Sequence, residues 1–153
     1  MKRKILIERA AGACGSGDDS FIARGLDDDV AVCIYDEERG IGAMVRPALP
    51  DERRCCLGNS NPYVYAREGV QKAIAEMEAL GANTADMYAF LVGGALGKLC
   101  RKNGWDVGKR TLERAKKELI KRGVHIAGQY TGGYERRNIE FDLEAGGLHL
   151  TVA

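Results

Sequence analysis

The residues from Arg137 to Val152 constrain the fold more than any other part of the chain. From Asn138 to Leu143, polar and apolar residues alternate at every position. Successive side chains of a strand point to opposite faces, so this segment predicts a strand with one buried face. The next residues, Glu144–Gly147, contain two glycines and predict a hairpin turn into a second strand at Leu148–Val152.

Two further segments have helical rather than alternating periodicity. Apolar residues recur at helical spacing from Tyr65 to about Leu80, and Gly81 is predicted to end the helix. A second stripe runs from Arg110 to Arg122 and ends at Gly123. Six other segments have the composition of strands, and together with the two helices they predict an α+β fold. These segments are Lys2–Ile7, Phe21–Arg24, Val30–Tyr35, Gly40–Arg46, Met87–Val92 and Val124–Gln129.

Small residues dominate the segment Gly12–Gly17, which is predicted to be an exposed, mobile loop. Cys14 within it is expected to react quickly with a thiol reagent. The second helix also carries a basic stripe, which is predicted to be a solvated face, with contact to an acidic partner as the alternative. The stripe consists of Arg110, Arg114, Lys117 and Lys121.

The length of 153 residues predicts one domain, spanning residues 1–153. The net charge of +1 gives no bulk preference for nucleic acid or for a membrane surface. No apolar run is long enough for a membrane span or for the core of a signal peptide, so a cytoplasmic location is expected.

The cysteines and histidines do not form a metal-binding pattern. An odd number of cysteines without an export signal predicts free thiols, and Cys33 is expected to be buried. His125 and His149 lie in separate apolar-alternating stretches, so neither a metal nor a cofactor is expected. The five cysteines are Cys14, Cys33, Cys55, Cys56 and Cys100.

A set of short motifs occurs in the order found in the CheD family of chemotaxis proteins. Gly25–Cys33 reads Gly-Leu-Asp-Asp-Asp-Val-Ala-Val-Cys and resembles the family signature Thr-x-Gly-Leu-Gly-Ser-Cys-Val-Ala-Val. Gly42–Pro50 reads Gly-Ala-Met-Val-Arg-Pro-Ala-Leu-Pro and is similar to Gly-x-Met-x-His-x-x-Leu-Pro. No single motif is specific, but the collinear set is. The remaining matches are Tyr65–Ala66, Phe90–Ala95, Val107–Arg110, Thr131–Gly133 and Arg137.

The resemblance implies a fold, an activity and two classes of partner. The fold is a mixed β-sandwich flanked by helices. The family hydrolyses the side-chain amide of particular chemoreceptor glutamines to glutamate and releases ammonia. Its members bind chemoreceptor helices and also a CheC-type phosphatase, which competes with the receptor for the same face.

The sequence departs from the family pattern at every position that the resemblance assigns to chemistry. Asp29 stands where the family has its nucleophilic cysteine, Arg46 where it has the histidine base, and Ala23 where it has a threonine. Deamidation needs a thiolate and a group that can accept and return a proton. An arginine stays protonated at physiological pH and cannot serve as that base. The resemblance therefore implies a degenerate, inactive member.

Neighbouring positions of the family's binding face have changed as well. Asp27 and Asp28 replace Gly-Ser, and Tyr134 replaces the asparagine that follows the Gly-Gly turn. The positions expected to form this face are Asp27, Asp28, Thr131, Gly132, Gly133 and Tyr134. The three consecutive aspartates could ligate a hard cation, but a solvated, arginine-paired turn is preferred because consecutive strand residues point to opposite faces.

Three functions from different classes remain open at this point. The first is a binding module that docks chemoreceptor helices or a CheC-type phosphatase without chemistry. The second is an active glutamine deamidase that uses a different site, through Asp29, Cys14 or Cys33. The third is a scaffold without either role. If the family backbone is retained, Asp29 and Arg46 are predicted to form an ion pair across neighbouring strands.

Overall fold

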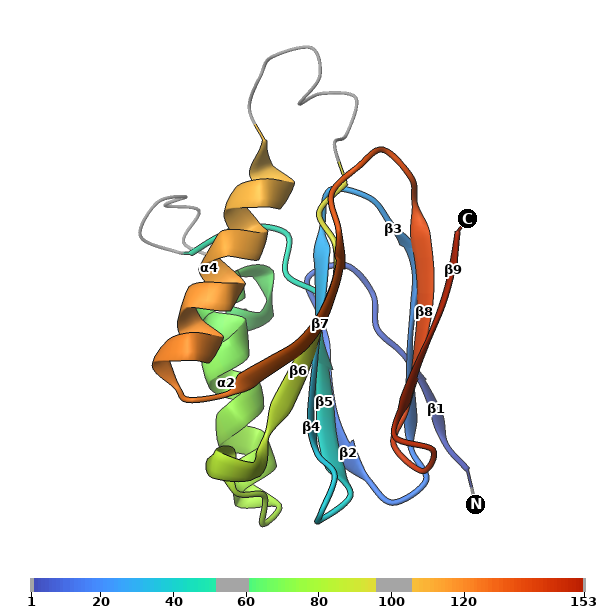
Figure 1. Cartoon of the computed structure of the whole chain (residues 1–153), viewed down its shortest axis with the longest axis vertical. Coiled ribbons are helices and arrows are strands. Elements are labelled where there is room, and N and C mark those ends of the chain that lie inside the picture. Colours follow the sequence, from blue (N-terminus) through green and yellow to red (C-terminus); the bar gives the residue numbers. More distant parts are fainter. Residues whose placement is uncertain (1, 52–60, 96–105, 153) are drawn as a thin grey trace.

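The computed structural model describes residues 2–51, 61–95 and 106–152. Two β-sheets lie face to face, and two helices cover the outer face of one of them (Figure 1). The α+β sandwich flanked by helices is therefore confirmed. No helix among these residues is long and apolar enough to cross a membrane.

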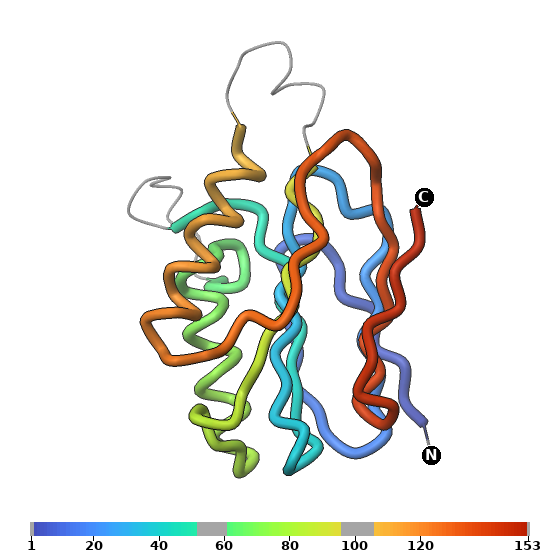
Figure 2. Tube along the Cα trace, in the orientation of Figure 1, coloured from blue at the N-terminus to red at the C-terminus, as the bar shows by residue number. Residues whose placement is uncertain are grey.

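The four-stranded sheet combines the two ends of the chain, as the path of the trace shows (Figure 2). Its first two strands in spatial order are parallel and the other neighbours are antiparallel. The predicted hairpin at the C-terminal end is present, with its turn at residues 143–146. The strands, in spatial order, are β1 (Lys4–Leu6), β3 (Ser20–Leu26), β8 (Arg137–Asp142) and β9 (Gly147–Val152).

The five-stranded sheet has β4 at its centre, and every residue of β4 is buried. Only the pair β6–β7 is parallel in this sheet. The strands, in spatial order, are β2 (Gly12–Ser16), β5 (Ile41–Val45), β4 (Val30–Asp36), β6 (Tyr88–Gly93) and β7 (His125–Thr131).

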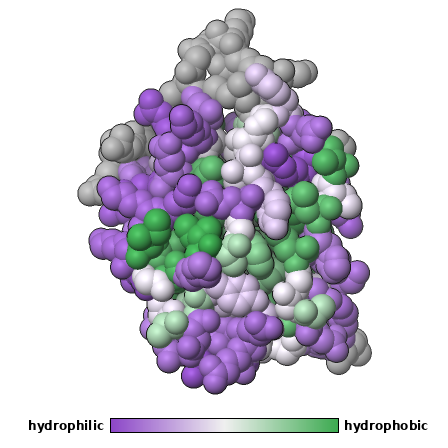
Figure 3. Space-filling model, in the orientation of Figure 1, coloured by the Kyte–Doolittle hydropathy of each residue, from purple (hydrophilic) through white to green (hydrophobic). Residues whose placement is uncertain are grey.

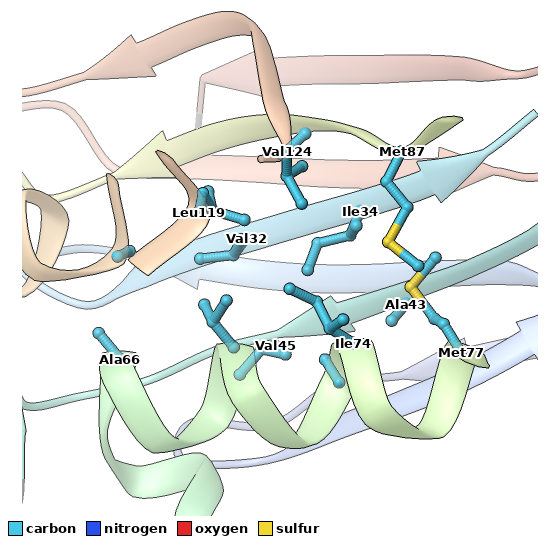
Figure 4. Packing of buried hydrophobic residues seen from close by; sticks show 14 of the residues in the cluster. Val32, Ile34, Ala43, Val45, Ala66, Ile74, Met77, Met87, Leu119 and Val124 are labelled. Carbon is cyan, nitrogen blue, oxygen red and sulfur yellow. The ribbon is translucent and has the colours of Figure 1, made fainter. Parts of the chain in front are cut away.

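Alternation along β4 divides the apolar interior into two layers. Val32 and Ile34 point toward the helices and join the core shown in Figure 4. Ala31 and Cys33 point the other way, into the core between the two sheets. A strand whose two faces are both covered has no polar side, so Val30–Tyr35 is a continuous apolar run.

Both predicted helices are present, with small shifts at their ends. Helix α2 spans Ala66–Ala79 and helix α4 spans Val107–Lys121. Helix α4 begins three residues before the predicted start because the Asp106 side chain caps it, accepting from the backbone N–H of Lys109 at 2.8 Å. Two short 3-10 helices, η1 (Pro62–Val64) and η2 (Thr84–Asp86), complete the described elements.

The expected mobile loop at Gly12–Gly17 is wrong, because Gly12–Ser16 forms the edge strand β2, paired with β5. A Cβ at Gly12 would lie 2.6 Å from the Tyr63 ring, and one at Gly15 would lie 2.4 Å from Asp19 Oδ2. The glycines are therefore explained by close packing, not by mobility.

Candidate functional site

Asp29 and Arg46 lie side by side at one end of the core between the sheets. Asp29 immediately precedes β4, and Arg46 immediately follows β5, the antiparallel neighbour of β4. Arg46 Nε lies 2.5 Å from Asp29 Oδ2, and the two side chains are only 9% and 1% exposed. The ion pair predicted between these two residues is confirmed.

Further hydrogen bonds fix both members of the pair. Arg46 Nη1 donates to the carbonyl of Ile7 at 3.2 Å. Asp29 Oδ1 accepts from the backbone N–H of Asp27 at 3.0 Å, and Arg9 Nη1 lies 3.8 Å from the same oxygen. Buried charges are tolerated when they are paired and their remaining polar atoms have partners, and this arrangement meets that condition.

The other two aspartates of the triplet also face arginines. Asp28 Oδ1 accepts from Arg9 Nη1 at 3.0 Å, and Asp27 Oδ2 lies 3.7 Å from Arg136 Nη2. The preferred interpretation of an arginine-paired turn is thus confirmed. Its description as solvated is wrong for Asp29, which directly precedes the buried strand β4 and is only 1% exposed. Within the described part of the chain, no group of His, Cys, Asp and Glu side chains is placed to hold a metal ion.

The segment Gly93–Ala95, at the end of β6, is hydrogen-bonded to the turn formed by Asp27–Asp29, here called the aspartate turn. Gly94 N–H donates to the carbonyl of Asp29 at 2.9 Å, and Ala95 N–H donates to that of Asp27 at 2.7 Å. A Cβ at Gly93, whose φ is +105°, would lie 2.4 Å from the carbonyl oxygen of Asp29. Only glycine fits at this point, so the close approach fixes the turn against β6.

The predicted binding positions Thr131–Tyr134 come to the same end of the molecule. Thr131 pairs with Gly93 in the sheet, and Gly132 N–H donates to the Gly93 carbonyl at 3.0 Å. Arg137 joins these segments, because its Nη2 donates to the Gly132 carbonyl at 2.9 Å. Gly132 and Gly133 both have positive φ, and the turn leaves Tyr134 63% exposed. The residues expected to form one face are therefore neighbours in the fold.

Ala23 lies apart from this surface. It belongs to β3 in the four-stranded sheet, where it is fully buried in the core between the sheets. A methyl side chain at this position can only pack, so it supplies no hydrogen bond to the ion pair.

The two described cysteines are poor nucleophiles. Cys33 is completely buried in the core between the sheets, as predicted, and burial raises the pKa of its thiol. Cys14 packs on the opposite, helix-facing side of the same sheet. Burial, and then the nearby Glu76 carboxylate, raise the pKa of Cys14 to about 11.

The expected fast reaction of Cys14 is not supported, because the thiol belongs to a strand and not to a mobile loop. With a pKa of about 11, only about one thiol in ten thousand would be a thiolate at neutral pH. Cys14 and Cys33 are both free. Cys55, Cys56 and Cys100 lie outside the described residues.

Sequence reasoning missed several arginine contacts. It did not identify Arg9 as a partner of Asp28, and the sequence offers no signal for it, because only the docking of the chain after β1 brings the two together. It also placed Arg114 on the solvated face of α4, whereas Arg114 Nε lies 3.1 Å from Asp51 Oδ2, with the two side chains 18% and 1% exposed. Arg110, Lys117 and Lys121 are exposed as expected.

Comparisons with known proteins point to one family. The family model described as "CheD chemotactic sensory transduction" matches residues 48–152. A protein from Pyrococcus abyssi named "Probable chemoreceptor glutamine deamidase CheD" is 30% identical over 152 residues, covering 98% of this chain and 92% of the relative.

Two further relatives agree. The "Chemoreceptor glutamine deamidase CheD" of Thermotoga maritima is 32% identical, covering 84% of this chain and 78% of the relative. A "Probable chemoreceptor glutamine deamidase CheD" from Methanococcus maripaludis is 34% identical, covering 78% and 76%. Asp29 and Arg46 precede the residues that the family model matches.

Proposed function

This chain belongs to the CheD family of chemotaxis proteins, and we propose that it binds chemoreceptor helices without hydrolysing their glutamine side chains. Its relatives are named chemoreceptor glutamine deamidases. We infer that this chain shares their class of ligand but not their catalytic activity.

One observation carries the proposal: the buried ion pair between Asp29 and Arg46, with 2.5 Å between Arg46 Nε and Asp29 Oδ2. By the motif resemblance, these two positions correspond to the nucleophile and the base of the family. Hydrolysis of a carboxamide requires a nucleophile that reaches the amide carbon and a base that returns a proton to the departing ammonia. Asp29 is 1% exposed and Arg46 remains protonated, so neither requirement is met.

The expected cost to the reaction is large. Removing a nucleophile or its base from a comparable hydrolytic site lowers the rate by roughly 10⁴- to 10⁶-fold. The alternative of an active deamidase that uses Cys14 or Cys33 has little support, because burial raises the pKa of both thiols.

The surface around the pair supports a binding role. The aspartate turn, the Gly93–Ala95 segment and the Thr131–Tyr134 turn are joined by backbone hydrogen bonds, so their residues present one connected surface. Tyr134 presents an exposed aromatic ring, the kind of side chain that contributes strongly to protein interfaces. We infer that Asp27, Asp28 and Thr131–Tyr134 form the docking face.

The family resemblance also informs the other parts of the proposal. We infer that a CheC-type phosphatase is a second ligand, which competes for the docking face. We also infer that residues 1–153 act as one domain in the cytoplasm. A scaffold without either ligand is the competing interpretation.

The test is a binding titration with the purified cytoplasmic helical fragment of a chemoreceptor from the same organism. The unmodified chain is expected to bind the fragment and to leave its mass unchanged. Tyr134→Ala is expected to weaken binding by at least about tenfold, as for an interface hot spot. Leu80→Ala removes another exposed apolar side chain, after the end of α2, and serves as the matched control.

The outcomes separate the three functions. Binding that Tyr134→Ala weakens and Leu80→Ala does not supports the proposal. Absence of binding by the unmodified chain overturns it in favour of a scaffold. A gain of about 1 Da per glutamine in the fragment, the mass change of deamidation, overturns it in favour of an enzyme. A CheC-type protein is expected to displace the fragment.

A further inference from the structure

Positive charge is concentrated on helix α4. Its sequence Val107–Lys121 contains six lysines and arginines and two glutamates. The net charge of the whole chain is only +1, so the rest of the molecule is net negative. Helix α4 therefore carries an excess of cations that the rest of the chain does not share.

The inward-facing charges of α4 are used within the molecule. Arg114 pairs with Asp51, and Glu118 Oε2 accepts from Arg122 Nε at 2.9 Å and from Gln71 Nε2 at 3.2 Å.

The outward-facing charges are mostly cationic. Lys109, Arg110, Lys117 and Lys121 are exposed and Lys116 is half-buried, while Glu113 is the exposed carboxylate of the helix. Figure 3 shows hydrophilic surface on the α4 side of the molecule, interrupted by a hydrophobic patch in its lower part.

The exposed cations of α4 begin next to the docking face. A Cβ at Gly108, in the first turn of α4, would lie 2.7 Å from the carbonyl oxygen of Asp28 and 3.0 Å from the Cα of Gly94. Helix α4 therefore starts directly against the aspartate turn. Lys109 and Arg110 follow at once, and the exposed cations continue to Lys121, interrupted by the exposed carboxylate of Glu113. A rod-shaped ligand that binds at the aspartate turn would extend along this row of cations.

The spacing of the cations along α4 suits a ligand helix with a seven-residue repeat. Lys109 and Lys116 are seven residues apart, and so are Arg110 and Lys117. Seven residues span about 10.5 Å of helix, which is the repeat of a heptad-patterned helix. Acidic side chains at one outward position of successive heptads would meet these cations in register. Ile120 is 66% exposed, precedes Lys121 and lies one helical turn after Lys117, so it adds an apolar contact to the same region.

We propose that the exposed face of α4, formed by Lys109, Arg110, Lys116, Lys117, Ile120 and Lys121, is a second contact surface for a heptad-patterned helix with acidic side chains. This proposal rests on the proposed function, because the receptor helix that occupies the docking face is the ligand that extends along α4. The contact contributes affinity through charge complementarity, and its strength falls as salt rises.

The test compares two double variants that remove equal charge. Lys117→Gln/Lys121→Gln neutralises two cations of the α4 face. Lys4→Gln/Arg24→Gln neutralises two exposed cations of the four-stranded sheet and is the control. Binding of the same receptor fragment is measured at low and at high salt. Exposed ion pairs contribute little individually, so the α4 variant is expected to bind roughly three- to tenfold more weakly at low salt.

The control is expected to bind like the unmodified chain, and the difference between the variants is expected to shrink at high salt. Equal binding by the two variants overturns the α4 contact and leaves the docking face standing. Absence of binding by the unmodified chain removes the proposed function itself. Vesicles of phosphatidylglycerol and phosphatidylcholine form a separate arm. The contact is also overturned if they are bound and the receptor fragment is unaffected by the α4 change.

Discussion

Strand β4 has a buried aspartate at each end, and the two differ in what holds them. Asp36, its last residue, is 0% exposed and accepts from the backbone N–H of Asn83 at 2.9 Å. It also accepts from Arg39, three residues later, at 3.1 Å. Asp29, just before the strand, depends on Arg46, seventeen positions away and itself only 9% exposed.

This difference distinguishes a local structural turn from the pair that we propose to occupy a former catalytic site. Asp36 closes a local turn, and backbone donors together with a half-exposed arginine suffice for that purpose. A turn does not require a buried arginine from another strand, as at Asp29. Two buried and mutually dependent charges are costly to maintain, and this cost is the reason for proposing that the pair does more than close a turn.

The largest predicted effect is the loss of one member of the ion pair. Arg46→Ala leaves Asp29 buried without its principal cation and is expected to lower the free energy of unfolding by about 3–5 kcal/mol. Asp29→Ala is expected to cost a similar amount, because it leaves the guanidinium unpaired. Chemical denaturation of both variants measures the change. A sharp loss in one variant with no loss in the other would contradict a coupled pair.

Replacing both charges at once tests whether Asp29 and Arg46 are energetically coupled. Asp29→Leu/Arg46→Met exchanges the ion pair for apolar side chains and is expected to cost less than either single alanine change. The coupling free energy from the complete cycle of denaturation midpoints is the quantity of interest. Costs that simply add would show that the two residues stabilise the fold independently.

At the other end of β4, smaller effects are expected. Asp36→Asn replaces one accepting oxygen by a donor and should cost about 1–3 kcal/mol. Arg39→Ala should change stability far less than Arg46→Ala, because Asp36 keeps the backbone N–H groups of Arg39 and Asn83. Thermal melts of the two arginine variants, made side by side, test the comparison. Equal losses of stability in the two variants would show that the aspartates at the two ends of β4 do not differ in this way.

The sequence predicted the fold well wherever pattern and structure share a physical cause. Alternation in Asn138–Leu143 predicted β8, and the helical stripe after Pro62 predicted α2 within one residue at each end. The pairing of Asp29 with Arg46 was also predictable, because the motif resemblance placed both positions at one site. Each success depended on a local pattern or on a known spatial relationship.

The failures occurred where one composition fits two structures. Small residues at Gly12–Ser16 suit a mobile loop and equally suit a strand that lies against a ring, and only the position of Tyr63 decides between them. Arg114 matched the solvated stripe, but Asp51 draws it inward from a segment 63 positions earlier. Arg9 likewise contacts Asp28 only because the fold brings two separate segments together. Partners far apart in sequence leave no local pattern to detect.

Release of ammonia from a glutamine-bearing chemoreceptor fragment tests the central claim most directly. The unmodified chain and Asp29→Asn are both expected to stay at background, and so is Asp29→Cys, because Arg46 cannot act as a base. Asp29→Cys/Arg46→His restores both groups and is expected to recover a small rate. The account would be contradicted if the unmodified chain released ammonia and Asp29→Asn abolished that release.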